Sequence, residues 1–371
     1  MYLEKLTVQG LRNIREGLLL PEPNINIIYG ENGSGKTSLL EAIYLLGRGR
    51  SFRTTKLKTI INRDSPDCTV FASLIEDEPG RQNVSIGVTR SVDGGFQFKI
   101  SGQRVFTASV LAETLPILLM NSDSFALIEG GPGNRRRFLD WGVFHVEHPF
   151  REVWRKYQRC HKQRNNLLRH DKISSAQLAA WDKEYVELSQ QVADYRQRYF
   201  DKVLPEFRNT LALLNADLEL DYSLYRGWAE ESSLEEELKQ NRHRDLMAKT
   251  THCGVHRADL KLKCNGRPAK DVLSRGQEKL VVLAMQIAQG RVLAGAGNSH
   301  CLYLLDDLAA ELDQAHLAKG MQLLAKQGAQ VFLTGTNKEA LQAVIPKSVS
   351  SRIGLFHVKQ GVVDQEVTES V

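Results

Sequence analysis

A glycine-rich segment near the N-terminus places the strongest limit on how this 371-residue chain can fold. The segment GENGSGKT, residues 30–37, matches the pattern G-x-x-x-x-G-K-[ST]. It follows a β-branched run, residues 24–29, that predicts a buried strand, and it precedes residues 38–46, which have helical periodicity. A strand, a glycine-rich loop and a helix in this order form a phosphate-binding loop. We therefore expect an α/β fold that binds a nucleotide.

The same segment predicts how ATP and Mg²⁺ would be held. Glycines let the backbone turn its N–H groups toward phosphate oxygens, and the N-terminus of the following helix adds a positive dipole end. Lys36 is expected to bridge the β- and γ-phosphates, and the Thr37 hydroxyl to ligate Mg²⁺. The predicted ATP-binding residues of this segment are Gly30, Glu31, Asn32, Gly33, Ser34, Gly35, Lys36, Thr37 and Ser38.

A second motif, YLLDDLAAELD (residues 303–313), supplies acidic groups. Its apolar run predicts a buried strand that ends in two carboxylates. We predict that Asp306 binds Mg²⁺ and that Asp307 polarises the attacking water as a general base. Lys36, Asp306 and Asp307 are then the predicted catalytic residues. A strand followed by a helix N-cap, where Asp is common, is the alternative explanation of the acidic pair.

The pattern along the chain predicts two lobes. Strand and turn signals dominate the first hundred residues, with strands expected at 68–75, 83–90 and 96–100. Helical periodicity follows to about residue 214, and alternating helices and strands return after Ser274. We expect residues 1–124 and 251–371 to form one α/β lobe together, interrupted at 125–250 by a mainly helical lobe with a long helix pair.

Several signals for export or membrane insertion are missing from the sequence. No apolar run is long enough to span a bilayer, the N-terminus lacks a signal-peptide pattern, and the five cysteines are scattered. We therefore expect a cytoplasmic protein.

A third motif, LSRGQEK (residues 273–279), puts a Ser-x-Gly-Gln turn in front of a helical pattern. Together with the two motifs above, it makes the chain resemble the ABC-type ATPases. The resemblance implies that two copies bind head to tail, with Ser274 and Gly276 of one copy reaching the γ-phosphate held by the other. It also implies that Gln277 lies in this turn and that Asp313 lies at the same dimer seam. A helix N-cap without a ligand is the alternative for Ser274.

More specifically, the chain resembles the RecF family in the SMC-like DNA-repair branch of these ATPases. The resemblance implies an ABC-type P-loop ATPase head, lobe I, with an inserted helical lobe II. It implies an ATP-dependent homodimer that binds double-stranded DNA at gaps or junctions, helps to load RecA, and has RecR and RecO as partners. A subunit that powers a membrane transporter is the alternative, and a clamp in which hydrolysis has no role is a third possibility. The matching segments are GLRNIRE (10–16), LLGRGRSFR (45–53), EGGPGNRRRFLDW (129–141), GVHRADL (254–260), LSRGQEK and LLDDLAAELD.

Three positions depart from the pattern of many ABC-type ATPases. Asp307 stands where Glu is usual, and Gly335 and Thr336 stand where a switch histidine usually follows a strand. Residues 120–125, MNSDSF, contain no glutamine for a Gln loop. We therefore expect a weak, DNA-dependent ATPase in which ATP acts mainly as a dimerisation switch.

Basic residues are concentrated in two segments, although the net charge is only +5. Residues 42–63 contain no acidic residue, and residues 148–170 carry seven Lys or Arg against Glu152 alone. These segments suit the phosphate backbone of DNA, but a solvated basic turn and a helix kept soluble by its charges explain them equally well. The candidate DNA-contacting residues are Arg48, Arg50, Arg53, Lys56, Arg151, Arg155, Arg159 and Lys162.

The segment THCGVH (residues 251–256), with Cys264 downstream, offers possible zinc ligands. Its spacing matches no paired-ligand pattern, and it overlaps the GVHRADL segment. We therefore expect no metal site there.

Overall fold

The structure is a computed structural model, and it describes all residues except 76–82, 171–173, 298–300, 350–351 and 367–371. The chain forms two compact units: residues 1–124, 213–215 and 279–371 make the first, and residues 125–212 and 216–278 make the second. The sequence pattern predicts boundaries at 124/125 and 250/251. Residues 251–278 group with the second unit instead, because strand β10 (Asp259–Cys264) pairs there with β9 (Asp221–Tyr225).

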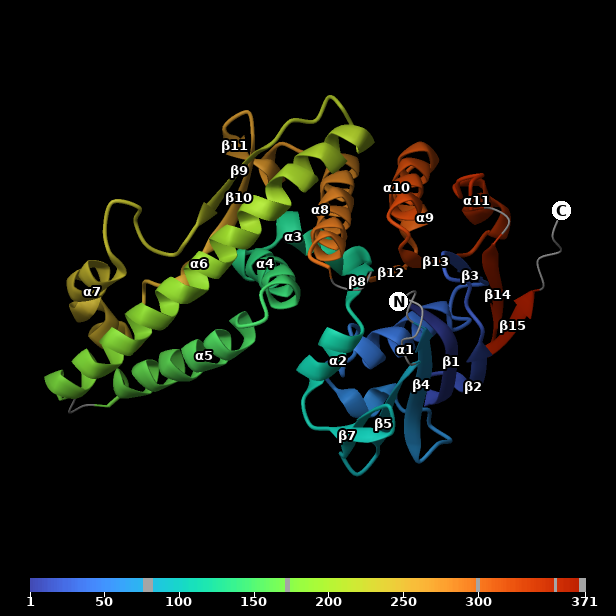
Figure 1. Cartoon of the computed structure of the whole chain (residues 1–371), viewed down its shortest axis with the longest axis horizontal. Coiled ribbons are helices and arrows are strands. Elements are labelled where there is room, and N and C mark those ends of the chain that lie inside the picture. Colours follow the sequence, from blue (N-terminus) through green and yellow to red (C-terminus); the bar gives the residue numbers. More distant parts are fainter. Residues whose placement is uncertain (76–82, 171–173, 298–300, 350–351, 367–371) are drawn as a thin grey trace. The chain divides into compact units, whose positions relative to one another are not determined.

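The first unit contains a six-stranded sheet in the order β15-β14-β3-β13-β12-β8 (Figure 1). Five neighbouring strands are parallel, and only the edge strand β15 is antiparallel. In parallel sheets, ligands bind outside the carboxyl ends of the strands. The loops that follow β3 and β12 therefore emerge at one edge, with only β13 between them. The bounds are β3 (Ile25–Tyr29), β8 (Ile117–Met120), β12 (Leu302–Leu305), β13 (Gln330–Gly335), β14 (Ile353–Lys359) and β15 (Val362–Glu366).

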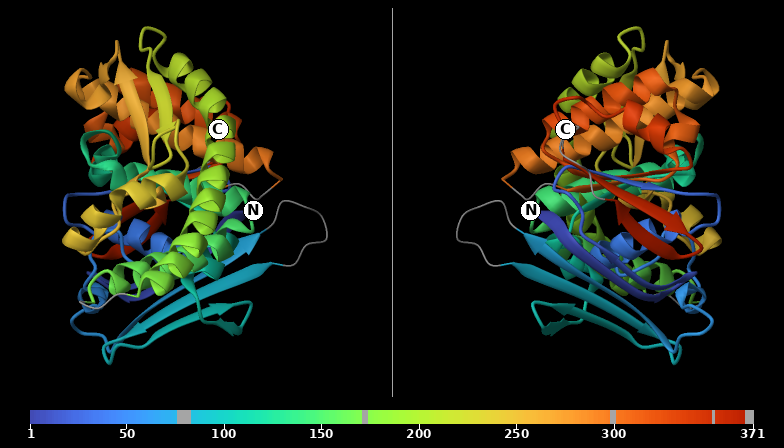
Figure 2. Two further views of the ribbon diagram at one scale, coloured as in Figure 1. Left: turned by 90° about the vertical axis from the view of Figure 1, so that its left-hand side faces the viewer. Right: turned by 90° about the vertical axis from the view of Figure 1, so that its right-hand side faces the viewer.

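A second sheet of the first unit is fully antiparallel, in the order β2-β1-β4-β5-β6-β7 (Figure 2). The strands predicted at 68–75, 83–90 and 96–100 are confirmed as β4, β5 and β6. The turn between β5 and β6 contains Gly94 in the left-handed region, with φ 98°. The bounds are β1 (Tyr2–Leu11), β2 (Ile14–Leu19), β4 (Asp67–Ile75), β5 (Val84–Ser91), β6 (Phe96–Ile100) and β7 (Gln103–Val105).

Helix α1 (Lys36–Arg48) is buried in the core that joins these two sheets. That core includes Leu6 of β1 and Phe332 of β13, both with no exposed surface. A Cβ atom on Gly47 would lie 2.5 Å from the carbonyl oxygen of Leu115, so the close approach of α1 to this segment requires glycine. Packing on both faces holds the first turn of α1, and therefore the glycine-rich loop before it, in a fixed position.

The second unit contains the predicted long helix pair, α5 (Phe150–Leu167) and α6 (Ser175–Leu214). It also contains a small antiparallel sheet in the order β11-β10-β9, which the prediction of a mainly helical lobe did not include. The run LKLKC alternates apolar and basic residues over only five positions, so its strand signal is short. The other elements of this unit are α3 (Ala126–Glu129), α4 (Pro132–Val146), α7 (Leu234–Ala248) and β11 (Arg267–Pro268).

Five further α-helices lie within the part of the chain that the structure describes. Helix α8 (Arg275–Gly295) begins in the second unit and continues in the first, whose remaining helices are α2 (Ala108–Thr114), α9 (Leu308–Glu311), α10 (Gln314–Lys326) and α11 (Lys338–Ala343). Within the described residues, no helix has the length and apolar character needed to cross a membrane.

Candidate nucleotide-binding site

The glycine-rich loop after β3 has a backbone that only glycine adopts without strain. Gly30 has φ 153°, and a Cβ atom there would lie 2.2 Å from the carbonyl oxygen of Val358 on β14. Gly35 has φ 124° and caps α1. Asn13 stabilises the loop from outside, because its Nδ2 donates to the Ser34 carbonyl at 2.8 Å and its Oδ1 accepts from the Ser38 hydroxyl at 3.2 Å.

The loop places a buried cation and an unpartnered hydroxyl beside each other. Lys36 is 4% exposed, and its Nζ donates to the carbonyl oxygens of Gly30 at 2.8 Å and Glu31 at 3.0 Å. The Ser34 Oγ is buried and has no hydrogen-bond partner among the residues that the structure describes. A phosphate oxygen would supply an acceptor for both groups, so this cradle fits the phosphates of a nucleotide.

Asp306 follows β12 and lies next to the glycine-rich loop. Its Oδ1 accepts hydrogen bonds from the hydroxyl of Thr37 at 3.1 Å and from the hydroxyl of Thr334 at 2.9 Å. Burial raises the pKa of this carboxyl, the hydrogen bond from Thr334 opposes that effect, and the charge of Asp307 adds to it. A desolvated carboxylate beside a hydroxyl provides the hard oxygen ligands that Mg²⁺ prefers. Thr37 and Asp306 therefore fit a Mg²⁺ ion.

Asp307 has a left-handed backbone with φ 50° and lines the same pocket. Its N–H donates to the Thr334 hydroxyl at 2.9 Å, so Thr334 contacts both acidic residues. Asp tolerates this conformation better than most residues. Because the backbone turns at Asp307, the Asp306 carboxylate faces Thr37, whereas Asp307 lines the pocket.

The pocket around these groups has a volume of 440 Å³ and is formed by the first unit. The phosphate-binding loop and Asp307 make one part of the lining, and residues from the β1–β2 turn and from 53–63 make the other. That second part gives a nucleotide room for its sugar and base. The lining residues are Arg12, Asn13, Asn32, Gly33, Gly35, Lys36, Thr37, Ser38, Arg53, Thr59, Ile61, Arg63 and Asp307.

Arg12, Asn13 and Arg63 line the pocket although they were not predicted from the sequence. Glu41 on α1 has no exposed surface, and its two carboxylate oxygens accept from Arg12 Nη2 at 2.8 Å and Nε at 2.9 Å. Arg53 also lies 3.7 Å from Glu41. The segment GLRNIRE contained Arg12 and Asn13, but nothing local indicated that a charge on α1 would hold Arg12 at the pocket.

The signature turn begins α8 and is exposed. Ser274 and Gln277 form a reciprocal cap, since the Ser274 N–H donates to Gln277 Oε1 at 2.9 Å and the Gln277 N–H donates to Ser274 Oγ at 3.3 Å. A Cβ atom on Gly276 would meet nothing within 4 Å, so the turn is open on that side. Arg275 pairs with Glu129 within the second unit. The N-cap role of Ser274 is thus present, and its contact with a ligand stays a prediction.

Asp313 caps α10 through a 3.0 Å hydrogen bond from the His316 N–H, and its side chain is 63% exposed. The hydrogen bonds from His316 lower the pKa of its carboxyl, so it is charged at neutral pH. Its place at a dimer seam also stays a prediction.

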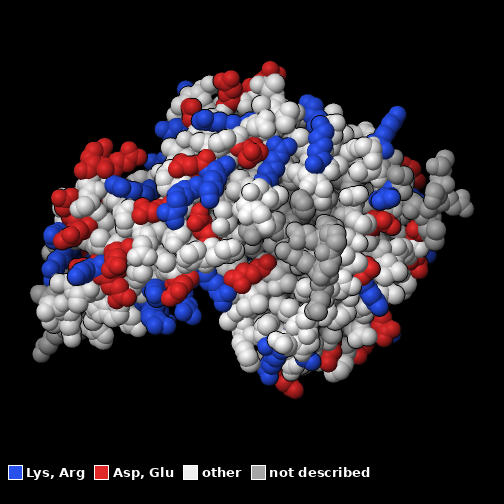
Figure 3. All heavy atoms as spheres, in the orientation of Figure 1, with Lys and Arg blue, Asp and Glu red and all other residues white. Residues whose placement is uncertain are grey.

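The candidate DNA-contacting residues fall into different environments. Arg53 lines the nucleotide pocket, and burial against its neighbours lowers the pKa of Arg48, whose guanidinium lies 6.0 Å from the Tyr44 ring centroid. Arg151 is partly buried. On the face in Figure 3, basic and acidic side chains are interspersed. Besides Arg53, the exposed candidates are Arg50 and Lys56 after α1, and Arg155, Arg159 and Lys162 along one side of α5.

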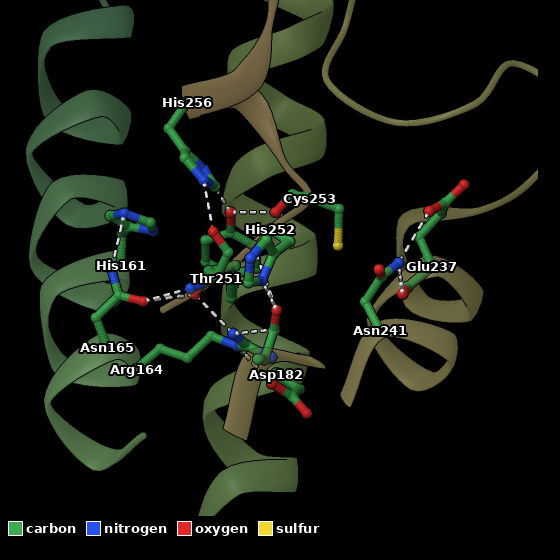
Figure 4. Close-up of polar contacts among 12 residues, drawn as sticks. His161, Arg164, Asn165, Asp182, Glu237, Asn241, Thr251, His252, Cys253 and His256 are labelled. Atoms are coloured by element: carbon green, nitrogen blue, oxygen red, sulfur yellow. Dashed lines mark hydrogen bonds and ion pairs between the residues drawn. The ribbon is translucent and has the colours of Figure 1, made fainter. Parts of the chain in front are cut away.

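His252 and His256, two of the possible zinc ligands, take part in a hydrogen-bond network of the second unit (Figure 4). Arg164, 1% exposed, donates to Asp182 at 2.7 Å, Asp245 at 2.9 Å and Thr251 at 2.6 Å. His252 Nδ1 lies 2.8 Å from Asp245, and His256 Nε2 donates to the Thr251 carbonyl at 3.0 Å. No group of three or more His, Cys, Asp or Glu in the described parts of the chain is arranged to hold a metal ion.

Comparison with known proteins identifies the family. The model of the RecF/RecN/SMC N terminal domain matches residues 2–364. The DNA replication and repair proteins RecF of Pseudomonas syringae pv. syringae (strain B728a) and Pseudomonas putida (strain F1) are each 44% identical to this chain, with 98% of both chains covered.

Solved structures show the same fold. The recombination mediator protein RecF-ATP in the RecFOR pathway has a TM-score of 0.85 at 24% identity, covering 99% of this chain and 98% of that chain. An Smc head bound to the C-winged helix domain of ScpA has a TM-score of 0.62 at 16% identity, covering 100% and 98%. An ATPase head with an inserted helical region is therefore the fold, as the sequence predicted. The chain belongs to the RecF family of DNA replication and repair proteins.

Proposed function

We propose that this protein is an ATP-dependent DNA-binding protein of recombinational repair, in which ATP drives formation of a head-to-tail homodimer. The family membership supports the repair role, and the likeness in fold to RecF-ATP of the RecFOR pathway supports ATP as the nucleotide. In this proposal the dimer binds double-stranded DNA at gaps or junctions in the cytoplasm, helps to load RecA, and works with RecR and RecO. The membrane-transporter alternative is not favoured, because the relatives along the whole chain are DNA replication and repair proteins.

One observation carries the proposal: Lys36, Thr37 and Asp306 lie together around the glycine-rich loop. The buried hydroxyl of Ser34 in the same loop has no hydrogen-bond partner among the described residues. On ATP binding, the Lys36 ammonium would exchange the carbonyl oxygens of the loop for β- and γ-phosphate oxygens. The Thr37 hydroxyl and the Asp306 carboxylate would hold Mg²⁺, which supplies positive charge to the phosphates. The Asp307 carboxylate would orient the attacking water and accept its proton.

The signature turn supports a site completed by a second copy. The N–H groups of Arg275 and Gly276 lie in the first turn of α8, where a helix leaves N–H groups without intrahelical acceptors. Ser274 and Gly276 are exposed, and nothing fills the space beside Gly276. A γ-phosphate held by another copy would suit these donors. Gln277 would keep the Ser274 backbone in place, and the charged Asp313 would lie along the same seam.

We infer that ATP hydrolysis is slow, because Asp307, the proposed general base, has a short side chain. Asp307 is one methylene shorter than the usual Glu, and its backbone amide is held by Thr334. A shorter carboxylate held in this way reaches less far toward the γ-phosphate. We therefore expect turnover well below about ten per second, with stimulation by DNA.

The dimer is tested by the molecular mass in solution, with and without ATP and Mg²⁺, at one salt concentration. The wild type should double its mass on addition of ATP and Mg²⁺. The Ser274→Arg variant should bind ATP with unchanged affinity but stay monomeric, whereas Ser348→Arg, which changes an exposed serine elsewhere, should dimerise normally. A wild type that stays monomeric while saturated with ATP on DNA, or a Ser274→Arg variant with normal dimerisation and turnover, would rule out the shared site.

The role of hydrolysis is tested with Lys36→Arg and Asp307→Asn. We expect Asp307→Asn to bind ATP, dimerise and remain on gapped DNA, while Lys36→Arg should fail to dimerise. If Asp307→Asn leaves DNA as fast as the wild type, hydrolysis has no role in release and the clamp interpretation is correct. ATPase activity that does not respond to DNA at all would contradict the DNA-dependent switch.

A further inference from the structure

The segment LKLKCNGRPAK, residues 260–270, forms a strongly basic hairpin in the second unit. It contains four Lys or Arg and no acidic residue. Strands β10 and β11 are joined by Asn265 and Gly266, with φ 51° and 75°, which is the backbone that a two-residue hairpin turn requires. We call residues 260–270 the basic hairpin. It lies outside the two segments from which the DNA-contact candidates were drawn.

Three lysines of the basic hairpin are among the residues that line one pocket. Lys261 and Lys263 alternate with Leu260 and Leu262, which are 4% and 8% exposed, so both ammonium groups lie on the open face of β10. Lys270, in the 3-10 helix Ala269–Asp271, lines the same pocket. The pocket has a volume of 240 Å³, and its walls are Ile128, Arg135, Asp259, Lys261, Leu262, Lys263, Pro268, Ala269 and Lys270.

Among the described residues, neighbouring carboxylates neutralise the charge of the basic hairpin only in part. Arg135 and Asp259 pair with each other at 2.7 Å, and Asp221 on β9 is the cross-strand neighbour of Lys263. The ammonium group of Lys261 lies 4.9 Å from the Tyr225 ring centroid. None of the three forms an ion pair with any residue whose position is described. Like charges gathered beside apolar walls repel each other, and an anionic ligand would remove that cost.

We propose that the basic hairpin binds the phosphodiester backbone of DNA, with Lys261, Lys263 and Lys270 contacting phosphates. The inference rests on the proposed DNA-binding function and assigns it a surface. Side chains two residues apart on one face of a strand repeat about every 6.8 Å, which presents an extended row of cations to a polyanion. Pro268, which lines the same pocket, adds an apolar surface that suits deoxyribose. Contacts of this kind position the duplex without selecting its sequence.

The basic hairpin is also connected directly to the signature turn. Lys270 and Ser274 are separated by three residues, and the Leu273 N–H within that link donates to the Ala269 carbonyl at 2.9 Å. A phosphate bound by Lys270 would therefore restrain the backbone that leads into Ser274. This connection gives DNA a short route to the residues proposed to complete the ATP site.

The test compares a Lys261→Gln/Lys263→Gln double variant with a Lys326→Gln/Lys359→Gln control, which removes two exposed lysines of the first unit. The dissociation constant for a gapped duplex is measured with ATP and Mg²⁺ across a series of salt concentrations. We expect the hairpin variant to bind at least about tenfold more weakly at low salt, on several unrelated sequences. The slope of log affinity against log salt should fall by about two, because each lysine that is replaced neutralises one phosphate in the wild type.

The control variant should match the wild type in both quantities, and ATP-driven dimerisation without DNA should be unchanged in both variants. A hairpin variant with the wild-type slope overturns the inference while leaving DNA binding by the protein intact. Loss of binding to RecR with unchanged DNA affinity overturns it in favour of an acidic protein partner. Wild-type protein that dimerises with ATP but binds no DNA overturns the proposed function itself.

Discussion

Thr334 donates a hydrogen bond from its hydroxyl to the Asp306 carboxylate at 2.9 Å, and the same hydroxyl accepts one from the Asp307 N–H at 2.9 Å. Thr334 lies near the end of β13 and has no exposed surface. One hydroxyl on the strand between β3 and β12 thus fixes both acidic residues that follow β12. This makes Thr334 a positioning residue for the predicted Mg²⁺ site.

Replacing Thr334 with Val should raise the Mg²⁺ concentration that ATP hydrolysis requires. The change keeps the shape but removes a hydrogen bond to a charged group, which contributes about 1.5–3 kcal/mol. We expect the Mg²⁺ concentration for half-maximal ATP hydrolysis to rise at least about tenfold, with Thr334→Ser near the wild type. The exposed Thr336→Val is the matched control. An unchanged Mg²⁺ titration for Thr334→Val would show that the hydroxyl does not position Asp306.

Replacing Glu41 with Gln should lower both stability and nucleotide affinity. Glu41 is fully buried and holds the guanidinium of Arg12, whose side chain is 20% exposed at the pocket. Gln keeps the volume but loses the charge and one acceptor, so we expect a loss of about 1–3 kcal/mol in the free energy of unfolding. Urea unfolding and ATP titration measure the two effects. Glu16→Gln, at an exposed site on β2, is the control and should change neither the stability nor the ATP affinity. A Glu41→Gln variant with wild-type ATP affinity would show that the position of Arg12 does not affect nucleotide binding.

Replacing Arg164 with Lys should strongly destabilise the second unit. Asp245 has no exposed surface, its charge is paired with Arg164, and the His252 backbone N–H donates to it at 3.0 Å. Lys cannot make the three branched hydrogen bonds of the guanidinium, so part of a buried charge is left unpaired at a cost of about 3 kcal/mol. The midpoint of unfolding of this unit should fall, and that of the exposed Arg159→Lys variant should not. Equal midpoints would mean that the network does not stabilise the fold.

Mild acid should destabilise the protein through two neighbouring histidines. Burial lowers the pKa of His161 to about 4 and that of His256 to about 3, with ring centroids 4.4 Å apart. In the neutral ring, His256 donates from Nε2 to the Thr251 carbonyl, and its Nδ1 lies 3.2 Å from the Tyr185 hydroxyl, which donates to the Cys253 carbonyl at 2.9 Å. Because both pKa values are depressed on folding, this stability is complete above pH 6.5 and falls as the pH decreases toward 4.

Each histidine should contribute a loss of about 1.4 kcal/mol per pH unit in that range. Urea unfolding at pH values of about 7 and about 5.5, on either side of the ordinary histidine pKa, measures the effect. His256→Gln should reduce the pH dependence, and the exposed His243→Gln should leave it as in the wild type. A His256→Gln variant with the full pH dependence would assign the effect to other groups.

The nucleotide site was predictable from the sequence because its chemistry is local. Gly30, Gly35, Lys36 and Thr37 are contiguous or nearly so, and an α/β strand–loop–helix unit places them with little help from the rest of the chain. Asp306 could be added because an apolar strand pattern ends at it. The three-stranded sheet of the second unit was not predictable in the same way, because its strands are short and pair across an intervening helix.

The order of residues along the chain was enough to specify the strand–loop–helix unit, the acidic pair after β12 and the long helix pair, because each depends on neighbouring residues and a regular period. Folding in three dimensions was needed to bring Thr334 to Asp306 and to make buried Glu41 hold Arg12 at the pocket. It also gathered the three lysines of the basic hairpin around one pocket. Sheet order and helix packing bring these groups together across gaps in the chain. A hydrogen bond or an ion pair depends on distance in space, which no local pattern of residues specifies.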